Sequence, residues 1–358
     1  MAAHLRADLE SLPSYIPGRS IPAAVKLASN EVSAPPPPSV VAAICAAAAT
    51  VNRYPDSTAP ALVQRLADRL DVPAAWLAVG CGSVMLCQQL VQATCGPGDE
   101  VVFAWRSFEA YPIITRVAHA RPRPVPLRAG HTLDVEALLD AITPATRLVF
   151  VCNPNNPTGT ALRRGELTAF LDTLPDGVLV ALDEAYHEFV TDPEVPDGIA
   201  LCRDRDNLAV LRTFSKAYRL AGLRVGYCVA PPPVISAVHR VYVPFSVNTV
   251  AQAAALASLE AAGELLAHCR VVTAERERVR AELLTMGYLV PPSQANFLWL
   301  PLGARTAAFN QHCLEHKIIV RAFDGEGARV SIGEASENDA FLAAARSFPR
   351  DARHTSPD

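Results

Sequence analysis

Short apolar segments alternate with longer helical stretches between residues 76 and 214, and this alternation constrains the fold more than any other feature of the chain. SVMLCQQLVQATC (83–95) and FEAYPIITRVA (108–118), for example, each follow an apolar run. The apolar runs in chain order are WLAVG (76–80), EVVFAW (100–105), TRLVFVCN (146–153), GVLVALDEA (177–185) and NLAVLRTF (207–214). Continuous apolar strands separated by helices are typical of a parallel or mixed sheet that is covered on both faces. The sequence therefore predicts an α/β fold.

The rest of the chain predicts a second, smaller unit, because 358 residues are too many for one simple core. We expect residues 1–38, which are rich in proline, to form an extended arm. A large domain over 39–235 follows and opens with a helix that Ser39 caps. Two long helical stretches and three strands then predict a small α+β domain over 236–348, with which the arm packs. We expect the tail, 349–358, to be disordered.

Composition excludes several classes of protein. Hydrophobic residues make up 50% and charged residues 19%, which is the balance of a compact soluble protein. The net charge of −4 gives no basic field for nucleic acid or an anionic membrane. No segment has the apolar length of a signal peptide core or a bilayer span. The 9 cysteines form no CxxC pair and indicate reduced thiols, so we predict a cytoplasmic protein.

Polar clusters directly follow four of the predicted strands. They are GCGS (80–83), NPNNPTG (153–159), DEAY (183–186) and RTFSK (212–216). Ligands of such sheets bind beyond the carboxyl ends of the strands, so the clusters predict one ligand crevice. Taken alone, the first two clusters are also explained as structural turns.

Lys216 and Asp183 indicate the chemistry of this crevice. The apolar setting of Lys216 lowers the pKa of a lysine and frees its amine to bind an aldehyde. Asp183 follows an apolar run, where a carboxylate needs a partner such as a protonated ring nitrogen. With a glycine turn and helix start as a phosphate seat, the set describes pyridoxal phosphate. The alternative for Lys216 is a buried lysine satisfied by backbone carbonyls.

Several motifs, in their order along the chain, carry a resemblance to a known family. They are KLASNE, NRYPD, VGCGS, WRSFEAYP, CNPNNPTG, DEAY, RTFSKAY and PFSVN. With them the chain resembles the fold-type I pyridoxal-phosphate aminotransferases of the histidinol-phosphate aminotransferase family, and within it the aromatic amino acid (phenylalanine) aminotransferases. The likeness runs from YIPGR (15–19) to ARVSIG (328–333). It implies a large domain with a mostly parallel seven-stranded sheet, a smaller α+β domain, and pyridoxal 5'-phosphate as cofactor.

The resemblance implies a role for each residue that matches the motifs of the family. Lys216 forms a Schiff base with the cofactor aldehyde and carries the proton between the substrate α-carbon and the cofactor C4′. Asp183 keeps the pyridine nitrogen protonated. Asn156 and Tyr186 bond to the ring hydroxyl, and Phe108 stacks on the ring. The implied phosphate ligands are Gly82, Ser83, Val84, Thr213, Ser215 and Arg224.

The same resemblance implies substrate-binding residues and a second subunit. Arg329 and Asn30 correspond to residues at the substrate α-carboxylate. Tyr15 and Arg321 correspond to residues of the side-chain pocket. Tyr54 is similar to a tyrosine that reaches the phosphate from a neighbouring subunit, so a homodimer with shared active sites is implied.

We therefore predict an enzyme that transfers the amino group of phenylalanine, tyrosine or tryptophan to a 2-oxo acid such as 2-oxoglutarate by a ping-pong mechanism. Histidinol phosphate is the alternative substrate, because Tyr15 and Arg321 would hold its phosphate. A decarboxylase of the same fold shares the same catalytic residue types. Arg219 replaces the small residue of relatives and either crowds the phosphate site or points to solvent. HCLEH (312–316) matches a zinc-peptidase pattern, which we interpret as a solvated helix face.

Overall fold

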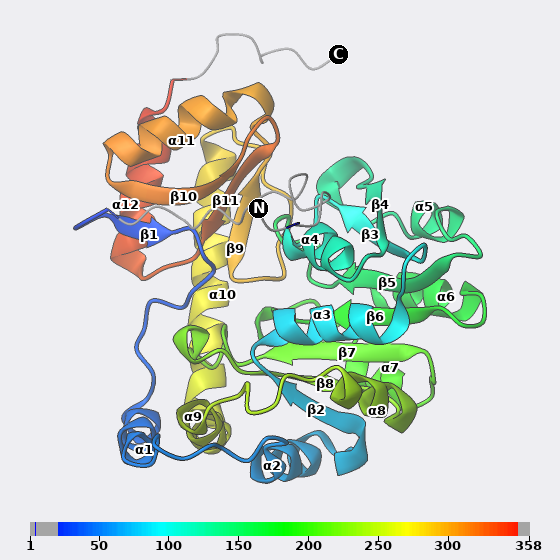
Figure 1. Cartoon of the computed structure of the whole chain (residues 1–358). Helices are drawn as coiled ribbons and strands as arrows, with labels where there is room; N and C mark the ends of the chain where they lie inside the picture. Colours follow the sequence, from blue (N-terminus) through cyan, green and yellow to red (C-terminus); the bar gives the residue numbers. More distant parts are fainter. Residues whose placement is uncertain (1–3, 5–20, 350–358) are drawn as a thin grey trace.

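A seven-stranded sheet forms the larger unit of the computed structural model, which describes residue 4 and residues 21–349 (Figure 1). Its strands are β2 (Leu77–Gly80), β3 (Glu100–Trp105), β4 (Arg121–Pro126), β5 (Thr146–Cys152), β6 (Leu179–Asp183), β7 (Leu208–Thr213) and β8 (Gly226–Val229). They lie in the order β2-β8-β7-β6-β5-β3-β4. Only β8 runs antiparallel to its neighbours. The predicted α/β class with a mostly parallel seven-stranded sheet is confirmed.

Helices cover both faces of this sheet. They are α3 (Ser83–Thr94), α4 (Ala110–Val117), α5 (Val135–Asp140), α6 (Arg164–Thr173), α7 (Gly198–Cys202) and α8 (Pro232–Arg240). Leu86 of α3, Tyr111 of α4 and Val238 of α8 are buried in the core on one face. Leu138 of α5 and Phe170 of α6 are buried in the core on the other.

The side-chain alternation along the strands explains why the central strands have continuous apolar runs. In β6, Val180 and Leu182 belong to one core, whereas Leu179 and Ala181 belong to the other. Successive side chains of a strand point to opposite faces, so a strand covered on both sides has no polar position. The apolar run ends at Asp183, where β6 leaves the core.

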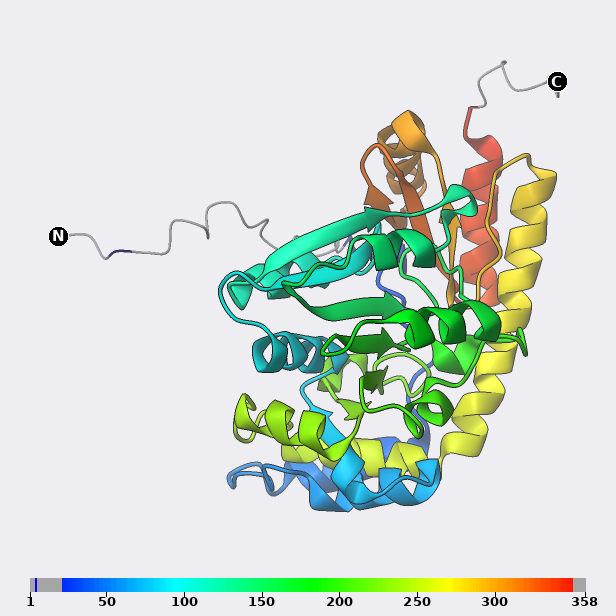
Figure 2. The same ribbon diagram turned by 90° about the vertical axis from the view of Figure 1, so that its right-hand side faces the viewer.

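A four-stranded sheet forms the smaller unit, in the order β1-β10-β11-β9. The elements of this unit are β1 (Val25–Leu27), β9 (Phe297–Leu300), β10 (Ile318–Phe323), β11 (Gly327–Ser331), α11 (Thr306–Glu315) and α12 (Ala335–Ser347). β1 comes from the N-terminal segment and pairs in parallel with β10. The long helix α10 (Ala262–Thr285) extends from the level of the large sheet to the small sheet (Figures 1 and 2).

The structure changes the predicted boundary between the two domains. A boundary after residue 235 falls inside α8, whose Ile235 and Val238 are buried in the core of the large sheet. The helix α9 (Thr249–Glu260) packs against α1 (Pro38–Ala48) and α2 (Pro60–Leu70) and not against the small sheet. Downstream of α9 the chain therefore reaches the small unit along α10, and it also passes between the two units upstream, between β1 and α1. Most of the predicted arm and tail lies outside the described residues.

The predicted cap of the first helix is wrong. The helix α1 begins at Pro38, and no side chain caps it. A proline at the first helical position lacks an N–H group that would otherwise have no partner inside the helix, so the helix starts without a cap. Ser39 lies within the first turn.

Two strands of the large sheet are absent from our sequence-based expectation. β4 has the sequence RPRPVP and lies at the edge of the sheet, where a missing N–H on one side costs no ladder bond. β8 is a short GYCV segment that lies between β2 and β7. β4 has no apolar run, and β8 is a four-residue strand, like β2, that we did not recognise in the sequence.

No single helix of the described residues is both long and apolar enough to cross a membrane. Among these residues, only α9 and α10 counted together pass by length and composition, and they meet at a bend of 79°.

A fully buried arginine joins the two units through α10. Arg276 is 0% exposed, and its Nη1 donates hydrogen bonds to the carbonyl oxygens of Phe189 (3.1 Å) and Ala295 (3.0 Å). Its Nη2 donates to Oγ1 of Thr191 at 3.1 Å. Phe189 and Thr191 follow β6 in the large unit, whereas Ala295 precedes β9 in the small unit.

We expect Arg276→Met to lower the free energy of unfolding by about 3 kcal/mol, because buried carbonyl groups lose a charged donor. The control is Arg278→Met on the same helix, whose side chain is 40% exposed and pairs with Glu275. An exposed pair contributes little, so this control loses less than about 1 kcal/mol. Urea denaturation of both variants tests the difference. Equal losses would contradict the linking role of Arg276.

Candidate active site

A cavity of about 630 Å³ opens at the carboxyl ends of β5, β6 and β7 and is closed by residues of the small unit. It brings together most of the residues that the sequence singled out. Those that line it are Asn30, Ser83, Val84, Phe108, Asn156, Asp183, Tyr186, Thr213, Ser215, Lys216, Arg224, Arg321 and Arg329.

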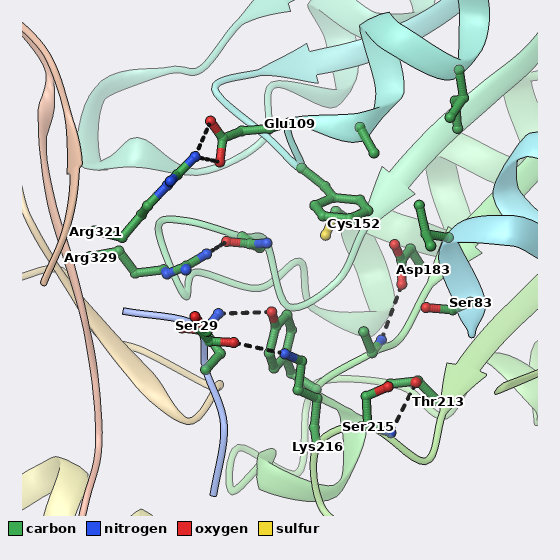
Figure 3. A pocket seen from close by; sticks show the side chains of 18 of the residues that line it. Ser29, Ser83, Glu109, Cys152, Asp183, Thr213, Ser215, Lys216, Arg321 and Arg329 are labelled. Atoms are coloured by element: carbon green, nitrogen blue, oxygen red, sulfur yellow. Dashed lines mark hydrogen bonds and ion pairs between the residues drawn. The ribbon is translucent and has the colours of Figure 1, made fainter. Parts of the chain in front are cut away.

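The amine of Lys216 lies inside this cavity, at the end of the loop that follows β7. Its Nζ donates a hydrogen bond to the carbonyl oxygen of Ser29 at 3.0 Å (Figure 3). Burial lowers the pKa of Lys216 to about 7, and the nearby charges of Arg329 and Arg224 act in the same direction. At neutral pH a large part of the amine is therefore unprotonated and able to act as a nucleophile or a base.

Asp183 lies at the end of β6 and is also buried. Oδ2 accepts a hydrogen bond from the phenol of Tyr111 at 2.8 Å, and Oδ1 accepts one from the amide of Ala185 at 3.2 Å. Burial raises the pKa of Asp183 to about 6, although these two hydrogen bonds oppose the shift. A buried carboxylate of this kind is stabilised by a cation such as a protonated ring nitrogen.

The N-terminus of α3 and a loop arginine form an anion seat at the same end of the cavity. No side chain caps α3, so its first amides are available to a ligand. Arg224 has a φ of 55° and its Nη1 donates to Oγ of Ser215 at 3.2 Å. Gly82 has a φ of 75°, and a Cβ there would lie 2.5 Å from Nη2 of Arg224. Glycine therefore permits the guanidinium to approach the helix start.

In the asparagine-rich loop after β5, two asparagines stabilise the loop and a third faces the cavity. The side-chain oxygen of Asn153 accepts from the amide of Leu162 at 2.7 Å, and Asn155 accepts from Oγ of Ser107 at 2.7 Å. These two asparagines hold the loop. The oxygen of Asn156, by contrast, faces the cavity and accepts a hydrogen bond from Nη1 of Arg329 at 2.6 Å.

Tyr186 and Asn30 form a second contact between the two units. The phenol oxygen of Tyr186 accepts a hydrogen bond from Nδ2 of Asn30 at 2.8 Å. The backbone N–H of Asn30 donates a hydrogen bond to Oγ of Ser331 at 2.8 Å. Burial raises the pKa of Tyr186 to about 12, so the phenol remains protonated and able to donate.

Two arginines of the small sheet face the cavity. Arg329 of β11 is 7% exposed and also donates to the carbonyl oxygen of Ala28. Arg321 of β10 lies opposite Arg329 in the strand register. Its Nη2 donates to both carboxylate oxygens of Glu109, at 2.9 and 3.1 Å. Phe108, beside Glu109, packs edge-on against Tyr111 with the ring centroids 5.5 Å apart.

Two predicted site residues do not line this cavity, and a third lies outside the described residues. Gly82 is not among the lining residues but lies next to Arg224. Tyr54 lies on the surface with 82% of its area exposed, against the ring of Phe245 at 4.7 Å. Tyr15 lies outside the described residues.

Sequence reasoning missed Tyr111 and Glu109, although both lie in the quoted motif WRSFEAYP. Nothing in the local pattern shows that the phenol of Tyr111 reaches Asp183, because the two residues lie on different elements. Arg219 donates from Nη1 to the carbonyl oxygen of Pro35 at 2.7 Å. It does not line the cavity.

The HCLEH segment lies on α11 and its histidines have protein partners. His312 Nε2 lies 3.0 Å from the carbonyl oxygen of Ala344, and His316 Nδ1 lies 2.9 Å from the carbonyl oxygen of His312. Within the part of the chain that the structure describes, no three His, Cys, Asp or Glu side chains gather as metal ligands would.

The side chains present fit pyridoxal phosphate. An anion seat, a buried carboxylate and a lysine with a lowered pKa open to one cavity, where they match the phosphate, the pyridine nitrogen and the aldehyde of that molecule. With the mostly parallel sheet and the smaller domain, this arrangement defines the class of protein: a fold-type I transferase.

Comparison with known proteins then gives the family. The chain belongs to the aminotransferase class I and II family, whose model matches residues 22–344. An aromatic amino acid aminotransferase of Rhodococcus jostii is 58% identical over 347 residues, or 97% of this chain and 96% of the relative. A relative of the same description from Rhodococcus erythropolis is 56% identical over 343 residues, covering 96% of this chain and 95% of that protein.

A solved structure supports the fold. The histidinol-phosphate aminotransferase from Sinorhizobium meliloti in complex with pyridoxal-5'-phosphate is 29% identical to this chain. The two structures superpose with a TM-score of 0.89 over 97% of this chain and 98% of that one. The family of this chain therefore implies pyridoxal phosphate as its cofactor.

We expect the amine of Lys216 in cofactor-free protein to titrate near pH 7, so that its acetylation rate rises as the pH rises through that value. Competitive labelling with acetic anhydride, read by mass spectrometry, measures this rate. Arg329→Met removes a charge that lowers the pKa of Lys216, so the midpoint should move to higher pH. The control is Arg106→Met, whose guanidinium pairs with Glu326. A midpoint at the ordinary lysine value of about 10.4 would refute this electrostatic account.

Proposed function

We propose that this protein is a pyridoxal-phosphate-dependent aminotransferase that moves the amino group of an aromatic L-amino acid to a 2-oxo acid, with both substrates using one site in turn. One observation carries the proposal: Lys216, Asp183 and Arg329 open to the same cavity. The names of the two Rhodococcus relatives support aromatic amino acids as the substrate class.

The cavity residues would hold the cofactor by its phosphate, its ring nitrogen and its ring hydroxyl. Ser83, Thr213, Ser215, Arg224 and the first amides of α3 would bind its phosphate, and Asp183 its ring nitrogen. The protonated phenol of Tyr186 and the side chain of Asn156 would bind the ring hydroxyl. When bound, pyridoxal phosphate supplies an electron sink for the charge that develops on the substrate α-carbon.

The protein's own residues orient the substrate and move its proton. Arg329 binds the α-carboxylate, because its guanidinium presents two parallel donors to the two oxygens. Its contact with Asn156 holds it in place. Lys216, with a pKa lowered to about 7, would carry the proton between the substrate α-carbon and the cofactor C4′. Tyr111 is a positioning residue, since it holds the carboxylate of Asp183.

Apolar side chains line the part of the cavity that the substrate side chain would occupy. Phe108, Ala110, Ile113 and Ile114 come from α4 and the loop before it. They offer contacts to an aromatic ring and no partner for a charged group, which favours phenylalanine, tyrosine and tryptophan as donors.

Histidinol phosphate is the second candidate substrate. One observation favours it: Arg321 lines the cavity and is able to bind an anion. Its ion pair with Glu109 reduces that capacity. The proposed function therefore ranks aromatic amino acids first.

The surface around Tyr54 supports a homodimer with shared active sites. Tyr54, Val51 and Val243 are 82%, 63% and 55% exposed, and Phe245 is 43% exposed, which leaves apolar area at one place on the chain. The resemblance to the family implies that Tyr54 of a second copy covering this area would reach the phosphate seat of its partner. We place the enzyme in the cytoplasm, because all of its cysteines are free thiols.

The substrate prediction is tested without an acceptor. L-phenylalanine or L-histidinol phosphate is added to holoenzyme, and the cofactor absorbance and the 2-oxo product are measured. We expect the second-order rate constant of this half-reaction for phenylalanine to exceed that for histidinol phosphate by about tenfold or more, with phenylpyruvate and no carbon dioxide as product. Lys216→Ala should abolish the response. Lys26→Ala, with a side chain 43% exposed, is the control. The reverse ranking would identify histidinol phosphate as the substrate. Release of carbon dioxide would identify the protein as a decarboxylase.

Shared active sites are tested by mixing two inactive variants. Tyr54→Ala should weaken cofactor binding, and Lys216→Ala should be inactive. Heterodimers of the two carry one site with both native residues, so about a quarter of the sites in a statistical mixture regain activity. Light scattering measures the dimer mass. A monomer, or a mixture without recovered activity, would contradict the shared site.

A further inference from the structure

We propose that a buried ion pair between Glu184 and Arg212 positions the ends of β6 and β7, and with them Asp183 and Lys216, for the bound cofactor. The inference deepens the proposed function and rests on it. Glu184 and Arg212 belong to the DEAY and RTFSK motifs, yet neither of them lines the cavity. Both are positioning residues, because they act through the residues beside them in the chain.

The two side chains lie behind the cavity. Glu184 follows Asp183 and Arg212 precedes Thr213, and both Asp183 and Thr213 line the cavity (Figure 3). Successive residues of a strand point to opposite faces, so Glu184 and Arg212 point away from it. Leu182, two residues before Glu184, belongs to the core on that other face of the sheet.

The pair is almost completely removed from water and is held by several hydrogen bonds. Glu184 is 1% exposed and Arg212 is 5% exposed. Oε2 of Glu184 accepts from Nε of Arg212 at 2.9 Å and from Nη2 at 2.7 Å. Nη2 also donates to Oδ1 of Asp197 at 2.7 Å, and Oε1 of Glu184 accepts from the N–H of Gly198 at 2.7 Å. The pair therefore ties both strand ends to the start of α7.

The close approach of α7 depends on a glycine. A Cβ at Gly198 would lie 2.5 Å from Cδ2 of Leu182 and 2.7 Å from Oε1 of Glu184. Any other residue there would push the carboxylate from its place. The position of Glu184 is thus determined on three sides, by β7, by α7 and by the core of the large sheet.

The ion pair joins the two strands where their regular pairing ends. The register of β6 and β7 ends with Asp183 opposite Leu211, and the N–H of Glu184 donates to the carbonyl oxygen of Leu211 at 2.9 Å. Past this point the chain after β7 continues to Lys216. The bonds between Glu184 and Arg212 hold that segment against β6, so they determine how far Asp183 lies from Lys216.

A rigid cofactor makes this spacing important. Pyridoxal phosphate carries its ring nitrogen and its aldehyde on one flat ring, so Asp183 and Lys216 must lie at matching places. A displacement of about 1 Å costs a reaction about 100-fold in rate. Stability alone does not account for the pair, because apolar residues of similar volume are often as stable as a buried ion pair or more so.

The first test is Arg212→Lys, which keeps the positive charge but cannot hold Oε2 of Glu184 through two nitrogens. We expect the dissociation constant of pyridoxal phosphate, measured by absorbance titration of the cofactor-free protein, to rise about tenfold. A charge without the fork would suffice if only electrostatics mattered, and the dissociation constant would then stay at the wild-type value.

A second readout is the proton transfer itself. The half-reaction of the holoenzyme is followed with phenylalanine and with α-deuterated phenylalanine. In Arg212→Lys the rate should fall about tenfold and the isotope effect should increase, because transfer by a misplaced Lys216 becomes slower relative to the other steps. A smaller amount of folded enzyme would lower the rate and leave the isotope effect unchanged.

The double variant Glu184→Gln with Arg212→Met separates positioning from stability. It removes both charges together, so no buried charge is left without a partner and the urea midpoint should stay close to wild type. We expect cofactor affinity and the isotope effect to change as in Arg212→Lys. A structural role alone would restore both to wild-type values once the midpoint is restored.

The matched control is an ion pair that joins two other strands of the same sheet. Nη1 of Arg123 on β4 lies 3.2 Å from Oε1 of Glu100, the first residue of β3, and neither residue lines the cavity. Glu100→Gln with Arg123→Met should keep the wild-type cofactor affinity and isotope effect. Values within about twofold of wild type in both Arg212 variants, or equal changes in this control, would overturn the inference.

The same measurements separate this inference from the proposed function. If the wild-type holoenzyme converts phenylalanine to phenylpyruvate and the Arg212 variants keep wild-type values, only the role of the ion pair is rejected. A wild-type holoenzyme that transaminates no amino acid rejects the proposed function itself.

Discussion

Burial of an amine and a carboxylate in one cavity is the constraint on which this site depends. Lys216 loses part of its affinity for protons, and Asp183 gains some, because both are removed from water. Neither buried group is stable without hydrogen-bond partners. Tyr111 supplies one to the carboxylate, and the carbonyl of Ser29 supplies one to the amine. The cavity thus holds an amine that is able to accept a proton near neutral pH and a buried carboxylate that is stabilised by a cation.

The two structural units build this environment together. The strand ends of the large sheet carry Asp183 and Lys216, whereas the small unit carries Arg329. Contacts between them are polar and specific: Arg329 bonds to Asn156, and Asn30 bonds to Tyr186. Because α10 crosses from one unit to the other and carries the buried Arg276, the relative position of the two sheets is fixed by side-chain hydrogen bonds as well as by the chain itself.

Much of the fold was predictable because a doubly covered sheet leaves a strong local signal. The apolar runs identified β2, β3, β5, β6 and β7, and the polar residues directly after them identified Asp183 and Lys216. β4 was missed because an edge strand with the sequence RPRPVP has no apolar run, and β8, which is as short as β2, was not recognised in the sequence. The boundary after residue 235 failed for a related reason: three prolines there begin a helix of the large unit and do not mark a linker.

The sequence by itself determined the class of fold and the chemical kinds of residue at the site, because strand periodicity and the groups that follow a strand are local properties. Only the tertiary structure decided which residues meet. Tyr111 contacts Asp183 across 72 positions, and Arg321 contacts Glu109 across 212. No local pattern records such pairs, since they depend on strand register and on how the small sheet lies over the large one. Which charged side chains pair, and therefore which charges remain in the pocket, depends on the tertiary structure.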